Sequence, residues 1–293
     1  MSDIQGLASR IALIGTLTML MLVSVSAYLR LSAANLGCEP WPACYAQASH
    51  AAPSSEPQPH PVARLAHRIL ASAAGVIVLL VAFVDLRAQA RSPRRIGRAV
   101  LLVALTAALA GLGRFTPGTT SLAVALGNLL GGAALTVLLW WAALDPAGAT
   151  ARFAPAHPSL SRSGRVRWLA YSVLVAAAIQ FILGALISTT GAAAQCGALP
   201  FCAGSTWTAA ELLHLAHRLA ALLLIVAAGG LAVVLLRGGP RVSRRAAALS
   251  VVVLLQSAAG VSMIISGFPL WLALAHNLGG VLVLLAAVAA VCG

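Results

Sequence analysis

The sequence contains no lysine and few acidic residues: all 19 of its basic residues are arginine, against six Asp and Glu. Charged residues make up only 9% of the 293 residues, whereas a soluble domain carries roughly 25%. So few charges cannot cover a water-exposed surface, which excludes an ordinary soluble protein. Aromatic residues are also scarce, at 5%, and small and aliphatic residues fill the apolar stretches, as in packed transmembrane helices.

Long apolar runs dominate the sequence. Runs of roughly 20 residues are long enough to cross a bilayer. They predict eight spans, near 9–31, 62–86, 97–115, 121–144, 167–189, 210–236, 246–266 and 269–292. The mean hydropathy of +0.95 agrees with a chain that is embedded in lipid. We therefore expect a polytopic membrane protein with a bilayer as its main partner.

The arginines gather in the connections after the second, fourth and sixth apolar runs. The positive-inside rule then places these connections and both termini in the cytoplasm. Residues 32–60 and 190–209 face the other side, which is the periplasm if the membrane is a bacterial inner membrane. Because the basic clusters alternate with apolar runs, the net charge of +13 reflects membrane topology, and we expect no nucleic-acid partner.

Two cysteine pairs are the first sign of an internal repeat. Cys38 and Cys44 follow the first span, and Cys196 and Cys202 follow the fifth. Both pairs are spaced C-x5-C, lie 158 residues apart and fall on the predicted outer side. An oxidising compartment favours a disulfide within each pair. A metal site is the weaker alternative, because no histidine lies among these cysteines and the spacing is unusual for zinc.

Two further matches extend the repeat. Ala-His-Arg occurs at His67 and again at His217, 150 residues later. Ala-Leu-Gly-Asn, ending at Asn128, matches Ala-Leu-Ala-His, ending at His276, and a Gly-Gly pair follows each. Three matches in the same order indicate a duplication, in which Asn128 takes the place of His276.

The duplication predicts an all-α protein of eight transmembrane helices, arranged as two pseudo-symmetric four-helix bundles. We expect an N-terminal half at residues 1–145, a cytoplasmic linker at 146–165 and a C-terminal half at 166–293.

Four histidines lie in or at the ends of spans, where an ionisable group is costly and indicates function. They are His67, His214, His217 and His276. His217 and His276 come from the second and fourth helices of one bundle, near the same depth. Such a pair can bind a haem iron from both sides, although a single histidine of this kind can also hydrogen-bond between helices. Gly279 and Gly280 are expected to leave room for the macrocycle. Zinc needs more ligands than are nearby.

The neighbouring polar residues have alternative interpretations. His214, one helical turn before His217, is a candidate to support haem propionates or a rival ligand. Arg68 and Arg218 can pair with propionates, or snorkel to lipid headgroups. His50, His60 and His157 lie in polar connections and are expected to be solvated.

The motifs together resemble the haem A synthase family (CtaA/Cox15). The matching segments are LGCEPWPAC, AHR at the second span, C-x5-C after the fifth span, HLAHR in the sixth and LAHNLGG in the eighth. The resemblance covers nearly the whole chain. It implies that His217 and His276 bind a low-spin haem b in the C-terminal half. It also implies that haem O binds in the N-terminal half and that its C8 methyl group is oxidised to the formyl group of haem A.

Within that resemblance, His67, Cys38 and Cys44 become the catalytic candidates at the substrate site, with His67 as an axial ligand and the cysteines as a redox-linked pair. Haem O synthase and cytochrome oxidase assembly factors become candidate protein partners, and self-association is left open. Two positions depart from the family pattern. Arg64 stands where the family has a glutamate, and Asn128 stands where it has a second histidine.

The leading hypothesis is therefore a haem A synthase-type oxidoreductase with His67 as the single axial partner of its substrate. Arg64 and Asn128 favour an alternative, a non-catalytic b-type cytochrome in electron transfer, haem delivery or oxidase assembly. A third interpretation is an unrelated cytochrome b-like protein or a transporter. For a transporter, Gln180 and Gln256 are the best-placed polar residues.

Overall fold

The computed structural model describes residues 2–33, 60–87, 93–116, 121–144, 164–202, 207–235 and 240–291. In these segments, eight helices are long and apolar enough to cross a membrane, and they coincide with the eight predicted spans. They are α1 (Ser2–Ala33), α3 (Pro61–Arg87), α4 (Pro93–Phe115), α5 (Leu122–Ala143), α7 (Gly164–Thr190), α8 (Ala209–Leu235), α9 (Pro240–Ile265) and α10 (Leu270–Val291). The prediction of an all-α polytopic membrane protein is confirmed.

Local sequence sets several helix ends. Three helices begin with proline, at Pro61, Pro93 and Pro240, because the first helical position needs no N–H donor and suits the fixed φ of proline. At the start of α8, Thr208 and Glu211 form a reciprocal capping box. The Thr208 N–H donates to the Glu211 carboxylate (2.9 Å), and the Glu211 N–H donates to the Thr208 hydroxyl (3.3 Å).

A Schellman turn joins α9 directly to α10. The Phe268 N–H donates to the Met263 carbonyl (2.8 Å) and the Gly267 N–H to the Ile264 carbonyl (3.3 Å). Gly267 has φ = 70°, a left-handed conformation that glycine adopts without strain. The Phe268 side chain is 2% exposed and packs on Ala27 and Leu31 of α1 and on Ala273 of α10. The turn therefore fixes α10 against the N-terminal half.

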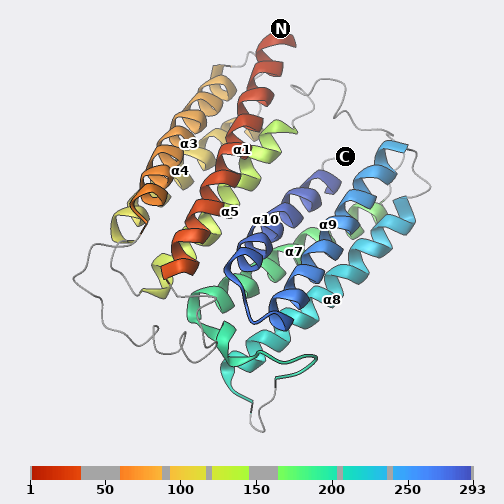
Figure 1. Cartoon of the computed structure of the whole chain (residues 1–293). Coiled ribbons are helices and arrows are strands. Elements are labelled where there is room, and N and C mark those ends of the chain that lie inside the picture. The colour runs from red at the N-terminus through yellow and green to blue at the C-terminus, as the bar shows by residue number, and fades with distance from the viewer. Residues whose placement is uncertain are drawn as a thin grey trace.

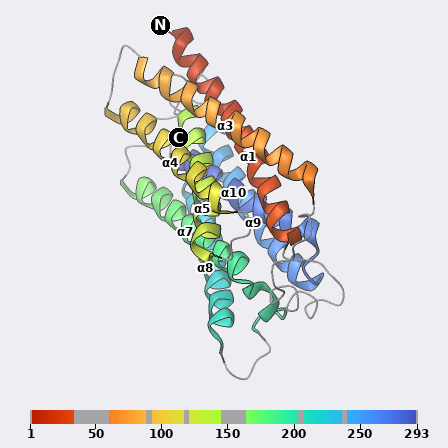
Figure 2. The same ribbon diagram turned by 90° about the vertical axis from the view of Figure 1, so that its left-hand side faces the viewer.

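The helices of each half contact one another in a ring. In the N-terminal half (α1, α3, α4 and α5), α1 packs against α3 and α5, and α4 packs against the same two helices (Figure 1). In the C-terminal half (α7 to α10), α7 packs against α8 and α10, and α9 packs against the same two. The halves touch through α1 with α10 and through α5 with α7 and α10, and Figure 2 shows this packing from the side.

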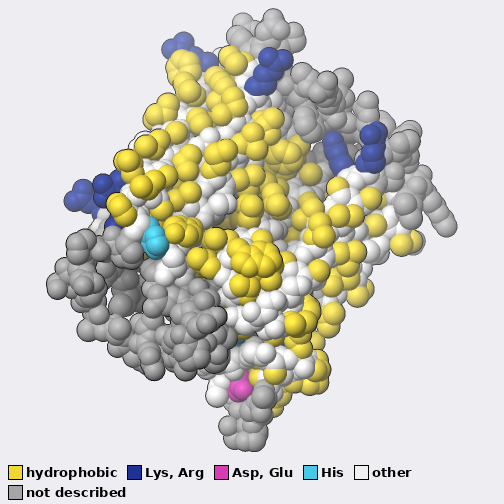
Figure 3. Space-filling model, in the orientation of Figure 1, with side chains coloured by type: hydrophobic (Ala, Val, Ile, Leu, Met, Phe, Trp, Pro, Cys, Tyr) yellow, Lys and Arg dark blue, Asp and Glu magenta, His cyan; other side chains and the backbone are white. Residues whose placement is uncertain are grey.

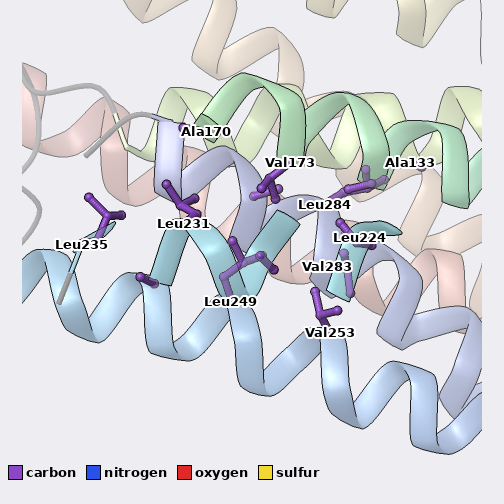
Figure 4. Packing of buried hydrophobic residues seen from close by; sticks show 14 residues of the cluster. Ala133, Ala170, Val173, Leu224, Leu231, Leu235, Leu249, Val253, Val283 and Leu284 are labelled. Atoms are coloured by element: carbon purple, nitrogen blue, oxygen red, sulfur yellow. The ribbon is translucent and has the colours of Figure 1, made fainter. Parts of the chain in front are cut away.

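Each half has its own apolar core. In the C-terminal half, alanine, valine and leucine side chains from all four helices meet, and Ala133 of α5 joins them from the other half (Figure 4). Such small and branched side chains let helices approach closely, so that dispersion contacts hold them together in lipid. The face seen in Figure 3 is broadly hydrophobic, with basic side chains at its edges. A lipid-facing band of this kind fits a membrane-embedded chain.

A buried ion pair closes one end of the N-terminal half. The Arg98 guanidinium donates to both carboxylate oxygens of Asp85, at 2.8 and 2.6 Å, so that α4 is held to the end of α3. Arg98 also lies over the ring of Trp141 on α5, at 5.7 Å from the centroid. A two-point Arg–carboxylate contact is among the stronger polar contacts, and it ties three helices of this half together.

Candidate functional site

The four helices of the C-terminal half surround a cavity of about 430 Å³. His217 from α8 and His276 from α10 both line it, and their ring centroids lie 6.4 Å apart with an angle of 73° between the ring planes. Most of the lining is apolar, and it includes Leu31 and Leu129 from the N-terminal half. The structure thus brings together the two histidines that the repeat singled out, inside an apolar space.

Glycines make room for both histidine rings. An added Cβ at Gly184 of α7 would lie 3.1 Å from His217 Cε1, and one at Gly260 of α9 would lie 3.0 Å from His276 Cε1. These distances are tighter than ordinary van der Waals contact, so a side chain at either position would push the ring aside. Each histidine ring therefore lies against a glycine on the helix that faces it.

Two glutamines complete the polar part of the cavity. Gln180 of α7 places its amide nitrogen 3.2 Å from His217 Nε2. Gln256 of α9 donates from its amide nitrogen to the peptide oxygen of His276 at 2.8 Å. The side-chain oxygens of both glutamines and Nδ1 of both histidines are buried without a hydrogen-bond partner. Buried polar groups are rarely left unpaired unless a site uses them.

The two glycines of the Gly279-Gly280 pair differ in role, and only Gly279 departs from the expected one. The sequence suggested that these glycines leave room for a macrocycle. In the structure a Cβ at Gly279 would overlap the Gln256 side-chain oxygen, whereas Gly280 lines the cavity beside Phe181. Gly279 therefore makes room for a glutamine of the same protein rather than for a ligand.

His214 and Arg218 have partners outside the cavity centre. His214 is 5% exposed, and its Nε2 lies 3.0 Å from the carbonyl of Ala192, in the short 3-10 helix Ala192–Gln195. Arg218 donates to the carbonyls of Pro200 (2.8 Å) and Cys196 (3.3 Å), although its buried Nε has no partner. Both residues line the cavity, and their predicted contact with propionates stays a prediction.

A disulfide joins Cys196 to Cys202, with the Cα atoms 4.9 Å apart. The Arg218 guanidinium lies 3.2 Å from the Cys196 sulfur, so the bridged segment is tied to α8 one residue after His217. In the described part of the chain, no three His, Cys, Asp or Glu side chains gather where they could hold a metal ion. The predicted partners Cys38 and Cys44 lie outside the described residues.

The N-terminal half arranges its matching residues differently. His67 on α3 is half-buried, Arg68 beside it is exposed, and Asn128 on α5 donates its amide to the Thr116 hydroxyl at 2.7 Å. Leucines occupy the space near Asn128: Leu112 would meet a Cβ at Gly127 at 2.9 Å, and Leu109 would meet one at Gly131 at 2.7 Å. Within the described residues, no hydrogen bond or ring contact joins Asn128 to His67 in the way that the ring contact joins His276 to His217.

The polar contacts of His60 and Arg30 were missed by sequence reasoning. His60, expected to be a solvated loop residue, is half-buried, and its Nδ1 lies 3.1 Å from the Tyr28 hydroxyl of α1. Arg30 of α1 reaches into the other half, where it donates to the Ser188 hydroxyl of α7 and to Asn277 of α10 (3.1 Å). Ser188 lies 158 residues after Arg30, the same offset as the cysteine pairs, and this offset is the one signal that links them.

These features define a polytopic α-helical membrane protein whose C-terminal half holds two facing histidines in an apolar, glycine-lined cavity. The family model COX15-CtaA, described as a cytochrome oxidase assembly protein, matches residues 9–288. The chain belongs to this family. It is also 28% identical, over 315 aligned residues, to the heme A synthase of Shewanella oneidensis; the match covers 94% of this chain and 92% of that relative.

Proposed function

We propose that this protein is a haem A synthase, a membrane oxidoreductase that converts the C8 methyl group of haem O to the formyl group of haem A. The family match and the relative named heme A synthase support the activity. Oxidation of a methyl group to a formyl group removes four electrons and four protons and takes up the oxygen of one water. The protein therefore needs a substrate site and a route by which electrons leave.

The facing pair of His217 and His276 carries the proposal. Two neutral imidazoles on opposite sides are the ligand set of a low-spin haem, and the cavity between them is apolar and of a size expected for a bound cofactor. The fit is supported by the unpaired ring nitrogens and by the glycines that accommodate each ring. A haem b held there would supply one-electron transfer, while the surrounding side chains exclude water.

In the N-terminal half, His67 is the proposed axial partner of haem O. Cys38 and Cys44 are the proposed redox-linked pair beside it. Asn128 cannot replace a histidine as an effective iron ligand, and Arg64 cannot act as a carboxylate base. The proposed site therefore leaves one axial position of the substrate iron without a protein ligand.

The alternative is a non-catalytic relative that keeps only the haem b, and acts in electron transfer, haem delivery or oxidase assembly. One observation favours it: Leu109 and Leu112 fill the space beside Asn128, where a substrate macrocycle would need room. The C-terminal cavity serves both functions equally well, so the two differ only in the N-terminal half.

We further propose that the protein lies in a bacterial inner membrane. Both termini and the arginine-rich connections would face the cytoplasm, and the cysteine-containing segments the periplasm. A haem O synthase is the natural neighbour, because it makes the proposed substrate.

The deciding experiment is expression with a haem O synthase in a host that makes no haem A, followed by extraction and identification of the haems. Haem A is the expected product. Folded protein that carries haem b and yields no haem A would refute the haem A synthase activity. The non-catalytic b-type cytochrome would then be the remaining proposal.

A further inference from the structure

A charged side chain of the N-terminal half reaches the wall of the C-terminal cavity. Arg30, in the last turn of α1, donates from one terminal guanidinium nitrogen to the Ser188 hydroxyl of α7. Its other terminal nitrogen donates to the side-chain oxygen of Asn277 on α10, at 3.1 Å. Ser188 and Asn277 both line the cavity. These two donors therefore face polar groups of the protein, whereas a snorkelling arginine would direct them to lipid headgroups.

Both acceptors lie next to the facing pair of histidines. Asn277 directly follows His276 on α10. Ser188 lies about one helical turn beyond Gly184 on α7, the glycine against which the His217 ring lies. The guanidinium thus ties the helix that carries one histidine to the helix that supports the other. Its planar, rigid arrangement of donors suits a contact that spans two helices.

The end of α1 that carries this arginine is packed firmly against α10. Leu31, the next residue, is 5% exposed and lies in an apolar cluster with Ala27 of α1, Phe268 of the α9–α10 turn and Ala273 of α10. Ala273 precedes His276 by three residues on the same helix. Because close packing restricts the end of α1, the guanidinium has a defined position relative to the histidine on α10.

The matching positions of the N-terminal half cannot form the same contact. The 158-residue offset of the cysteine pairs makes Ser188 the counterpart of Arg30, and the offset that relates α5 to α10 makes Leu129 the counterpart of Asn277. A serine carries no charge, and a leucine side chain accepts no hydrogen bond. The contact therefore accompanies the histidine pair and is not part of the helix arrangement that the two halves share.

We propose that Arg30 is a positioning residue of the haem b site, contributed by the opposite half of the chain: it fixes α7 and α10 around the two histidines, and its positive charge raises the reduction potential of the bound haem. This inference rests on the haem b site proposed above. A nearby cation favours the ferrous form, because ferrous haem carries one positive charge fewer than ferric haem. A higher potential makes the haem a better acceptor for electrons that leave the substrate.

The test uses the full-length protein with Arg30→Met, which removes the charge and both donated hydrogen bonds and keeps an unbranched apolar side chain. Each purified protein is titrated with haem b, and a potentiometric titration then gives the midpoint potential of the bound haem. We expect the affinity to fall by roughly tenfold, which is the value of one hydrogen bond to a charged group. We also expect a lower midpoint potential, because the ferric form is no longer repelled by the guanidinium.

Arg30→Lys separates the two effects. Lysine keeps the charge, but its single ammonium does not reproduce the contact made by two guanidinium nitrogens. We expect a midpoint potential close to that of the wild type and an affinity that stays reduced. The matched control is Arg10→Met, which removes the same charge from an exposed position at the other end of α1, about 30 Å away. This control should match the wild type in both measurements.

Unchanged affinity and midpoint potential in Arg30→Met would overturn the inference. An equal shift of potential in Arg10→Met would also overturn it, since the effect would then come from the overall charge of the chain. A wild-type protein that binds no low-spin haem b would instead overturn the haem b site itself, so the two failures are distinguishable. If Arg30→Met does not accumulate, Ser188→Ala removes one acceptor and leaves the charge in place. We expect reduced affinity at an unchanged midpoint potential, and unchanged affinity in that variant would contradict the positioning role.

Discussion

The N-terminal and C-terminal halves share a ring of four helices but differ in what lies at the centre of the ring. The C-terminal half has an open cavity with two histidines and two glutamines, whereas in the N-terminal half leucines of α4 pack against the glycines on either side of Asn128. The same helix arrangement therefore supports either a polar cavity or an apolar core. A few side chains at matched positions decide which one forms.

The largest effect is expected from removing a histidine of the C-terminal pair. His276→Ala leaves His217 as the only candidate axial ligand, and bis-histidine ligation needs both. We expect complete loss of the low-spin haem spectrum in the purified protein. His67→Ala, the matched change in the other half, should leave that spectrum intact. A low-spin spectrum in the His276→Ala variant would show that His276 is not a haem ligand. The proposed difference in haem ligation between the two halves would then be wrong.

A second prediction concerns the ion pair that holds the N-terminal half. Asp85→Ala leaves the buried Arg98 guanidinium without its carboxylate, and breaking such a pair costs about 3–5 kcal/mol. We expect a clearly lower thermal unfolding temperature in detergent. The shape of the haem b spectrum should not change, because the pair lies outside the C-terminal cavity. The double variant Asp85→Leu, Arg98→Leu should recover most of the loss, since no charge is then left unpaired. Equal instability of the single and double variants would contradict this account.

The smallest effect is expected where the halves are made more alike. Asn128→His restores the histidine that the repeat predicts, but Leu109 and Leu112 still fill the space beside it. We expect the number of haems bound per chain to remain unchanged, as measured by haem extraction against protein content. An additional low-spin haem in Asn128→His would show that one side chain, and not the packing around it, separates the halves.

The spans were predictable because each is a long apolar run, and bilayer thickness imposes that length whatever the packing. The meeting of His217 and His276 was also foreseen, since the repeat placed them on alternate helices at a common depth. Their role as ligands, and that of His67, stays a prediction.

Other parts of the site could not be predicted in this way. The contacts of Gln180 and Gln256 with the two histidines depend on how each helix is rotated in the bundle, which hydropathy does not specify. Each glutamine precedes a cavity-lining glycine by four residues, and this repeated spacing was the available signal. The interpretation of Gly279 was wrong because a glycine shows that something lies close by, but not whether it is a ligand or another side chain. His60 looked like a solvated loop residue because its partner Tyr28 lies on a helix that precedes it by 32 residues.

The contact of Arg30 with Ser188 and Asn277 has a consequence for how the two halves can diverge in sequence. Asn277 follows His276 directly, and Leu31, the neighbour of Arg30, forms part of the cavity wall. Residues of the N-terminal half therefore form part of the cavity wall in the C-terminal half. Even if the first half lost all chemistry of its own, selection would still act on the end of α1. The two halves are therefore not independent modules.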